Sequence, residues 1–239
     1  MVLFRAPQRG LQLAALCVLQ EYERLKSKDA AWSGDFYITG VDEDLKRFFV
    51  SSLDSHKVRW LINEEPTVKT SFYFEFDEAR AYRLSESQRF NVVRTFGIML
   101  GCEPPSYFPD LRTDTAVLTT ETPLDFLVLP GLSEDFAERV LDIAHIVTVF
   151  HGYEGYRGME EILSCISQSK IVVGPTGVET YIAASLGKTV IELYPDSLIH
   201  TGWLSKFMTN RYYLVKETAL RARPRLLTET AEVVWARIS

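Results

Sequence analysis

The chain has 239 residues, of which 46% are hydrophobic and 24% are charged, and its net charge is −6. This composition supports a packed core and excludes an intrinsically disordered chain. The sequence has no uninterrupted run of about 18 apolar residues, so no membrane-spanning helix is expected. The acidic balance also argues against a protein that coats nucleic acid.

The amino terminus and the cysteines predict a cytoplasmic protein. The chain starts with MVLFRAPQRG and shows no basic segment followed by an apolar one, so no signal peptide is expected. Cys17, Cys102 and Cys165 are odd in number and have apolar neighbours, which is typical of reduced core thiols. No CxxC or HExxH spacing occurs, so no metal site is expected.

Short apolar runs alternate with helical patterns along the first half of the chain. The predicted strands are 2–4, 36–38, 58–62 and 72–76, and the predicted helices are 11–26, 43–53 and 85–100. The first helix is expected to be amphipathic, and Ser85 with Gln88 predicts a capping box. Residues 6–10, including Arg9 and Gly10, are predicted to form a turn after the first strand.

A proline-rich segment, 103–110, predicts a linker between two domains, because it suits neither a helix nor a central strand. Beyond it the predicted strands are 126–129, 146–150, 171–173 and 190–194, and the predicted helices are 133–144, 158–167 and 178–186. This alternation indicates an α/β protein with two Rossmann-like parallel domains, 1–105 and 113–215, and a helical tail at 216–239.

The segment 171–195, IVVGPTGVETYIAASLGKTVIELYP, is the most informative part of the chain. It predicts a buried strand, a turn at 174–177, a helix that Gly187 ends, and a second strand. The N–H groups and the positive dipole end of such a helix favour phosphate. The alternative is an ordinary strand-turn-helix unit without a ligand, since a short glycine-rich turn is a weak signal.

Four turns that follow predicted strands are expected to converge on one cleft, because parallel strands present their carboxyl ends at one edge of a sheet. These turns are Arg9–Gly10, Pro130–Gly131, His151–Gly152 and Pro175–Gly177. Two facing domains with phosphate-binding turns in the second suit an enzyme that joins two substrates.

The second half of the chain resembles glycosyltransferase family nine, the ADP-heptose:lipopolysaccharide heptosyltransferases, which have the two-domain GT-B fold. The family's pattern V-V-G-x-D-T-G-x-x-H-L-A-A-A-L-G-K-P matches residues 172–188, VVGPTGVETYIAASLGK. Gly152–Ile166, Leu127–Gly131 and Arg89–Pro109 also fit the family, so the resemblance covers about residues 85–200.

The resemblance implies a metal-independent, inverting transfer of a sugar from a nucleotide-sugar to an acceptor hydroxyl, with no cofactor. Residues 1–105 would bind the acceptor, through Arg9 and Gly10, and residues 113–215 would bind the donor. The donor-binding candidates are Gly131, Gly152, Gly174, Pro175, Thr176, Gly177, Val178, Glu179 and Tyr181. Among them, the Thr176 hydroxyl and the N–H groups of Gly177 and Val178 would stabilise the diphosphate leaving group.

The chain departs from the family at the expected catalytic base and at a phosphate-binding lysine. The family's first turn carries Gly-Asp, whereas Leu11 follows Gly10 here, and the turn after Gly131 has no lysine. Tyr181 stands at the family's helix-start histidine, and the chain is shorter than a typical member. An inverting transferase needs a base. The candidates for this base near strand ends are Asp42, Glu75 and Asp77.

Two functions remain open from the sequence. One is a compact glycosyltransferase whose acceptor is a glycan or a hydroxymethylated base in phage DNA. The basic clusters Arg5/Arg9 and Arg221/Arg223/Arg225 would serve the DNA acceptor. The other is a catalytically inactive protein that binds a nucleotide or a partner. His151, His200 and Trp203 are further candidates for contacts in the cleft.

Overall fold

The computed structural model describes residues 2–5, 9–29, 31–53, 57–66, 74–77, 92–102, 111, 123–144, 147–149, 159–194 and 211–239. The chain divides into two compact units: most of the first lies within Met1–Thr113, and the second consists of Asp114–Leu198 with Met208–Ser239. Each unit has its own parallel sheet.

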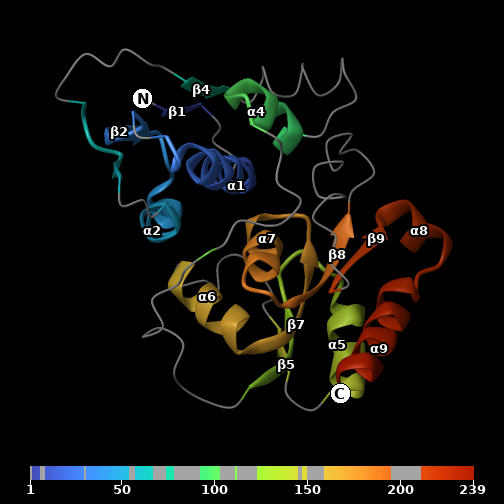
Figure 1. Ribbon diagram of the computed structural model, residues 1–239. Helices are drawn as coiled ribbons and strands as arrows, with labels where there is room; N and C mark the ends of the chain where they lie inside the picture. The colour runs from blue at the N-terminus through green and yellow to red at the C-terminus, as the bar shows by residue number, and fades with distance from the viewer. Residues whose placement is uncertain are drawn as a thin grey trace. The chain divides into compact units, whose positions relative to one another are not determined.

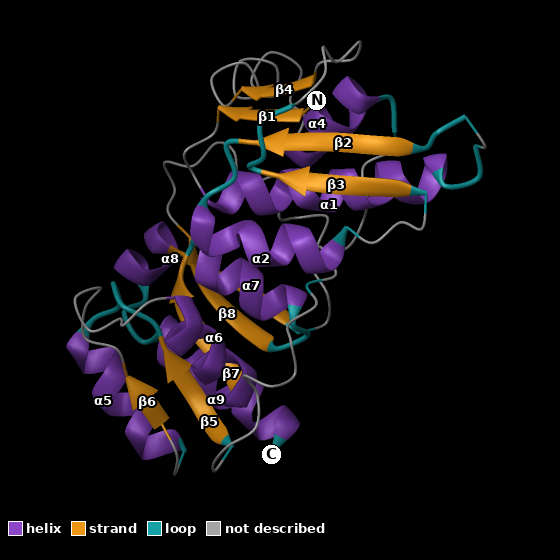
Figure 2. Cartoon of the chain, turned by 90° about the vertical axis from the view of Figure 1, so that its left-hand side faces the viewer, coloured by secondary structure: helices purple, strands orange, loops and turns teal. Residues whose placement is uncertain are grey.

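Unit 1 contains a four-stranded parallel sheet in the order β3-β2-β1-β4. Figure 2 shows these strands side by side in that order. The strands are β1 (Val2–Arg5), β2 (Gly34–Thr39), β3 (Val58–Ile62) and β4 (Phe74–Asp77), and the helices are α1 (Arg9–Lys26), α2 (Glu43–Ser52) and α4 (Val92–Leu100).

Helix α1 differs from the sequence prediction at its start and in its burial. Arg9 and Gly10 belong to its first turn, so the prediction of a turn at these two residues is wrong. Every side chain from Leu11 to Leu19 is buried, and α1 packs against both α4 and α2. The predicted amphipathic pattern is therefore wrong for this stretch, because helices cover α1 on more than one side. Leu25, in the last turn of α1, is 44% exposed.

Unit 2 contains a five-stranded parallel sheet in the order β6-β5-β7-β8-β9. The strands are β5 (Leu124–Val128), β6 (Val147–Val149), β7 (Ser169–Pro175), β8 (Thr189–Tyr194) and β9 (Tyr212–Lys216). The helices are α5 (Glu134–Ile143), α6 (Met159–Gln168), α7 (Val178–Ser185), α8 (Glu217–Ala222) and α9 (Leu226–Ile238).

Helices cover both faces of the unit 2 sheet. Helices α6 and α7 contact each other on one face, and α5 and α9 contact each other on the opposite face (Figure 1). The side chains of Leu227, Ala231 and Val234 from α9 join the same buried cluster as Phe126 and Val173 from the sheet. Helix α9 therefore completes the core of unit 2.

Two predictions about strands need correction. Gly174 and Pro175, predicted in a turn, are the last residues of β7 and pair in parallel with Glu192 and Leu193 of β8. Strand β9, which the sequence analysis did not predict, extends the sheet beyond β8. The other predicted elements agree with the structure to within a few residues wherever the structure describes them.

Several sequence predictions fall outside the described residues. These are the linker at 103–110, the capping box of Ser85 and Gln88, the turn His151–Gly152, and the candidate residues His200 and Trp203. Among the helices that the structure does describe, none combines the length and the hydropathy that a membrane span needs. Cys17, Cys102 and Cys165 are all free thiols, and the first two are buried.

Candidate functional site

The turn between β7 and α7 lies at the carboxyl end of the central strand of unit 2. The backbone N–H of Thr176 donates to the Leu193 carbonyl oxygen at 2.9 Å, which ties the turn to β8. Gly177 is the N-cap of α7, and its own N–H donates to the Thr180 hydroxyl at 3.2 Å. Residues 175–179 are half-buried, so the turn keeps access to solvent.

The first turn of α7 lacks the side-chain cap that two other helices have. Asp42 caps α2 by accepting from the Asp44 N–H at 3.0 Å, and Ser133 caps α5 by accepting from the Phe136 N–H at 3.3 Å. Gly177 has no side chain to do the same. Within the described part of the chain, the N–H groups of Val178 and Glu179 therefore have no side-chain acceptor. Such N–H groups at the positive end of a helix dipole bind anions.

The turn after β5 lies against the end of β7. A Cβ atom on Gly131, whose φ is +92°, would lie 3.4 Å from Pro175 Cγ. After β5 the chain adds β6 on one side of it and then β7 on the other side. The strand order therefore changes direction between β5 and β7. In parallel α/β sheets ligands bind at such a switch point. Gly131, Pro175, Thr176, Gly177 and Val178 thus lie together at this position.

Two further donor-site candidates, Gly174 and Tyr181, are packed inside unit 2, and a third, Glu179, lies beside the turn. A Cβ atom on Gly174 would lie 2.6 Å from Leu129 Cδ1, so the glycine makes room for the packing of Leu129. Tyr181 is 4% exposed and lies near the Tyr212 hydroxyl, whose pKa is raised by burial, then by Glu192 and then by Tyr181. Glu179 is half-buried, and its Oε2 would lie 3.0 Å from a Cβ atom on Gly177.

Glu192 is a fully buried carboxyl group directly behind the turn. It lies on β8 with 0% exposure, and it accepts hydrogen bonds from the Thr176 hydroxyl and from the Tyr212 hydroxyl of β9. Burial raises the pKa of Glu192 to about 7, although both hydrogen bonds act in the opposite direction. Burial, and then the nearby Glu192, raise the pKa of Tyr212 well above its ordinary value.

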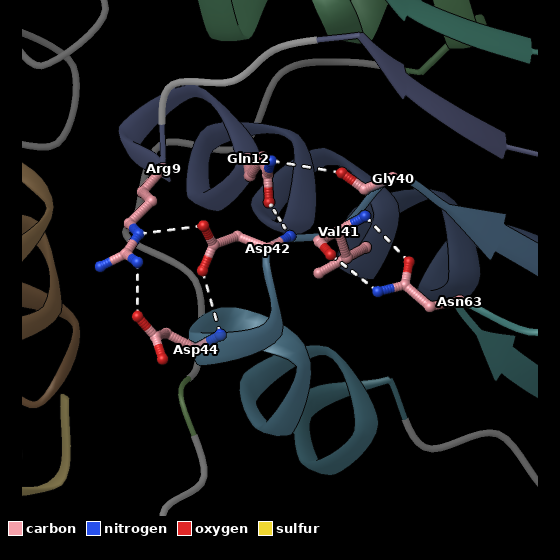
Figure 3. A network of polar contacts seen from close by, with 7 residues as sticks. All are labelled: Arg9, Gln12, Gly40, Val41, Asp42, Asp44 and Asn63. Atoms are coloured by element: carbon pink, nitrogen blue, oxygen red, sulfur yellow. Dashed lines mark hydrogen bonds and ion pairs between the residues drawn. The ribbon is translucent and has the colours of Figure 1, made fainter. Parts of the chain in front are cut away.

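In unit 1, Arg9 and Asp42 belong to a network of polar contacts at the carboxyl ends of the strands (Figure 3). Asp42 Oδ2 accepts from Arg9 Nε at 3.1 Å, while Asp42 Oδ1 caps α2. The guanidinium of Arg9 also pairs with Asp44. The sequence predicted that Asp42 is a catalytic base and that Arg9 contacts the acceptor substrate. In the structure these two side chains form an ion pair with each other.

In the same network, the side chains of Gln12 and Asn63 form hydrogen bonds with backbone atoms of the loop between β2 and α2 (Figure 3). Gln12, which is 2% exposed, accepts from the Asp42 N–H at 2.9 Å and donates to the Gly40 carbonyl oxygen at 3.4 Å. Asn63 accepts from the Val41 N–H at 3.0 Å and donates to the Val41 carbonyl oxygen at 2.7 Å. The loop between β2 and α2 is thus fixed from two neighbouring elements.

Asp77, the other predicted base, is the last residue of β4 and pairs in parallel with Arg5, the last residue of β1. Its side chain and that of Glu75 are half-buried. No group of three or more His, Cys, Asp or Glu residues that could hold a metal ion occurs among the residues that the structure describes.

The sequence analysis missed Glu192 and Tyr212. One signal was present: Glu192 is the only charged residue in the otherwise apolar run VIELY at 190–194. A charged residue inside a buried strand is rarely left without partners, so it marks a place where polar groups from other elements must meet it. Gln12 and Asn63 carried no comparable signal.

The fold is known from solved structures of heptosyltransferases. TibC of enterotoxigenic Escherichia coli H10407, an iron-containing heptosyltransferase solved in complex with ADP-D-β-D-heptose, superposes with a TM-score of 0.62 at 12% identity. The match covers 88% of this chain and 61% of TibC, so the chain spans about three fifths of the length of TibC.

Two other E. coli heptosyltransferases match over nearly their whole length. WaaC, solved with ADP, gives a TM-score of 0.60 at 11% identity over 98% of each chain. ADP-heptose lps heptosyltransferase II gives 0.54 at 9% identity over 100% of this chain and 99% of the other. No protein-family model and no curated protein matches the sequence. The chain therefore has an α/β fold with parallel sheets that is similar to that of the GT-B heptosyltransferases.

Proposed function

We propose that the chain is a glycosyltransferase whose unit 2 binds a nucleotide-sugar at the turn between β7 and α7. The observation that carries the proposal is the uncapped N-terminus of α7 at the strand-order switch between β5 and β7. The fold likeness to heptosyltransferases solved with ADP and with ADP-heptose supports the nucleotide.

In this proposal the donor diphosphate accepts hydrogen bonds from the N–H groups of Val178 and Glu179. Negative charge grows on the diphosphate as the sugar leaves, and fixed N–H donors stabilise that charge by about 3 kcal/mol each in enzymes. Transfer would be inverting. It would need no metal ion, because the helix dipole and these N–H donors supply the electrostatic stabilisation of the leaving diphosphate. Of the two base candidates, Asp42 caps α2 and pairs with Arg9.

The ion pairs of two arginines in the basic clusters count against DNA as the acceptor. Arg9 pairs with Asp42 and Asp44, and Arg223 pairs with Glu229 at 2.6 Å. A DNA-binding surface needs arginines that can neutralise phosphates, and these two are already engaged.

Proline in place of Val178 is the sharpest test of the nucleotide site. Val178→Pro removes one N–H donor, and proline is favoured at the first position of a helix. Gly177 before it has φ −175° and ψ 178°, an extended conformation that a residue before proline prefers. We expect wild-type protein to bind one of ADP-, UDP-, GDP- or CMP-sugars, and Val178→Pro to bind it at least about tenfold more weakly, as loss of a hydrogen bond to a charged group predicts.

The matched control is Glu217→Pro, the same change at the first position of α8, which should keep wild-type affinity. Binding is measured by thermal shift, where a ligand at about 100 times its dissociation constant stabilises by roughly 2.7 kcal/mol. Failure of every nucleotide-sugar to shift the wild-type protein contradicts the proposal.

The inactive binding protein is the second candidate function. Leu11 stands where the resembled family carries its aspartate, and it is 3% exposed, so no carboxylate occupies that position. Release of free nucleoside diphosphate from a bound nucleotide-sugar in the presence of bacterial glycans distinguishes the two. Tight binding of the nucleotide-sugar favours the inactive protein if no nucleoside diphosphate is released, either with glycans present or in water alone.

A further inference from the structure

We propose that Glu192 is a positioning residue that couples anion binding at the β7–α7 turn to the uptake of one proton. The inference rests on the proposed function, since it concerns the same turn. It starts from the single hydrogen of the Thr176 hydroxyl, which Thr176 donates to the Glu192 carboxylate.

The Thr176 hydroxyl has one hydrogen and can donate it to one strong acceptor at a time. Its other neighbour, the Leu193 carbonyl oxygen, is 3.4 Å away, so the carboxylate is the main acceptor. A phosphate oxygen at the turn would need the same hydrogen. The ionised Glu192 and a bound diphosphate therefore compete for the Thr176 hydroxyl.

Burial makes this competition costly for the ionised form of Glu192. The side chain is fully buried, and in the described part of the chain only the hydroxyls of Thr176 and Tyr212 donate to it. Loss of one of two donors leaves a buried charge poorly compensated. A diphosphate close by adds repulsion between like charges, which also disfavours the carboxylate.

Protonation of Glu192 removes the conflict. A proton from solvent forms an O–H bond on Glu192 Oε1, and this O–H donates to the Thr176 oxygen. The Thr176 hydrogen is then released and turns toward the anion. The Tyr212 hydroxyl keeps its hydrogen bond to Oε2 in both states. No electron is transferred, and the only species gained is one proton.

Three other titratable groups lie around this cluster. Tyr212 faces Glu192 from β9, and Tyr181 faces Tyr212 from α7. The pKa of Tyr212 is raised well above its ordinary value, so this hydroxyl remains protonated. Glu179 of α7 lies beside Gly177 at the same turn. The pKa of Glu192 itself, raised by burial to about 7, places the proton uptake in the neutral range.

The sign of the pH dependence follows directly. The protonated form binds the anion, so affinity is highest below the pKa of Glu192 and falls as pH rises above it. Bound anion raises that pKa further, and the fall continues until pH reaches the value of the complex. Each unit between the two pKa values changes the affinity about tenfold.

The test is calorimetric titration of the full chain with ADP-glucose and UDP-glucose, whose bridging diphosphate does not titrate near neutral pH. We expect wild-type affinity to be about tenfold weaker at about pH 9 than at about pH 7. Titration in two buffers with different ionisation enthalpies should show uptake of a proton. Glu192→Gln keeps the shape without the charge, and it should bind with the same affinity at both pH values.

Tyr212→Phe provides a second variant if Glu192→Gln does not fold. Loss of the Tyr212 hydrogen bond raises the pKa of Glu192, so the fall in affinity should move to higher pH. Tyr213→Phe, the neighbouring position in β9, is the matched control and should leave the pH midpoint where it is in the wild type.

The outcomes separate this inference from the proposed function. Binding with equal affinity at both pH values, or a Glu192→Gln variant that keeps the wild-type slope, overturns the role of Glu192 and leaves the nucleotide site intact. Absence of any nucleotide-sugar binding at either pH overturns both. A wild-type slope that Glu192→Gln removes and Tyr212→Phe shifts upward supports the coupling.

Discussion

At the residue scale, Gly174 illustrates how packing selects a glycine close to the β7–α7 turn. It lies within β7, and the position of its missing Cβ is filled by the Leu129 side chain that follows β5. Leu129 is 3% exposed, so its side chain packs inside the unit and not at its surface. A larger residue at 174 therefore forces two neighbouring strands apart.

Gly174→Ala should destabilise the protein by about 1–3 kcal/mol, since the new Cβ would meet Leu129 Cδ1 at 2.6 Å and Leu129 Cβ at 2.8 Å. Urea denaturation measures the loss. Gly177→Ala is the comparison: there the new Cβ would lie 3.0 Å from the flexible end of Glu179 and in ordinary contact, at 3.8 Å, with the Pro175 carbonyl oxygen. We expect a cost of about 1 kcal/mol or less. Equal stability of the two variants would contradict the packing role of Gly174.

Glu192 and Gly177 show opposite ways of treating a polar group. Glu192 is buried, and hydroxyls from the β7–α7 turn and from β9 satisfy it. At Gly177 the absence of a side chain leaves the N–H groups of the next residues without a side-chain acceptor, within the described part of the chain. Glu192 is thus a titratable group held inside the unit, whereas the N–H groups after Gly177 remain able to bind an anion.

At the scale of elements, helix α9 is the clearest case of a segment whose role depends on its packing. Its buried face, Leu227, Ala231 and Val234, contacts the same core as the central strands of unit 2. Trp235 also packs against Phe126 with tilted rings whose centroids lie 5.6 Å apart. The helix is part of the domain and contributes to its stability.

Ala231→Asp should therefore unfold or strongly destabilise unit 2, because Ala231 is fully buried and a charge there has no partner in the described core. A buried unpaired charge costs several kcal/mol. Circular dichroism during thermal unfolding provides the measurement. Glu232→Ala, the next residue and an exposed one, should change stability by no more than about 0.5 kcal/mol. A protein that tolerates Ala231→Asp equally well would show that α9 is a dispensable tail.

Strands β1, β2 and β3 show the same dependence in unit 1. Each is a short apolar run that the sequence predicts, while the network of Gln12, Asp42 and Asn63 fixes the loop where β2 gives way to α2. That network spans residues more than 20 positions apart in sequence. Local pattern cannot anticipate it.

At the scale of the whole molecule, the two units each bury a core around a parallel sheet. The candidate phosphate donors and Glu192 all belong to unit 2. The candidate bases Asp42 and Asp77 belong to unit 1. A nucleotide bound as proposed acts first on the local stability of unit 2.

Hydrogen exchange should locate that effect. Addition of a nucleotide-sugar that binds should slow amide exchange in α7 and at the carboxyl ends of β7 and β8, because bound ligand suppresses local opening. Mass spectrometry of peptides from 171–194 measures it, with peptides from 9–26 as the internal comparison. Protection confined to unit 1 would contradict a donor site at the β7–α7 turn.

The sequence by itself determined the alternation of parallel strands and helices, the start of α7 at Val178 and the helix stop at Gly187. These features depend on local propensity and periodicity, which neighbouring residues carry. The resemblance to heptosyltransferases, read from the same segment, agrees with the fold of the solved structures.

Only the tertiary structure decided what the individual polar side chains do. Arg9 and Gly10 read as a turn yet begin α1, β9 appears because it pairs with β8, and Asp42 is engaged by Arg9 and α2. Glu192 gains its partners from a turn 16 residues before it and a strand 20 residues after it. Such contacts depend on which strands become neighbours in the sheet, and that choice is made by burial of the whole core rather than by any local run of residues.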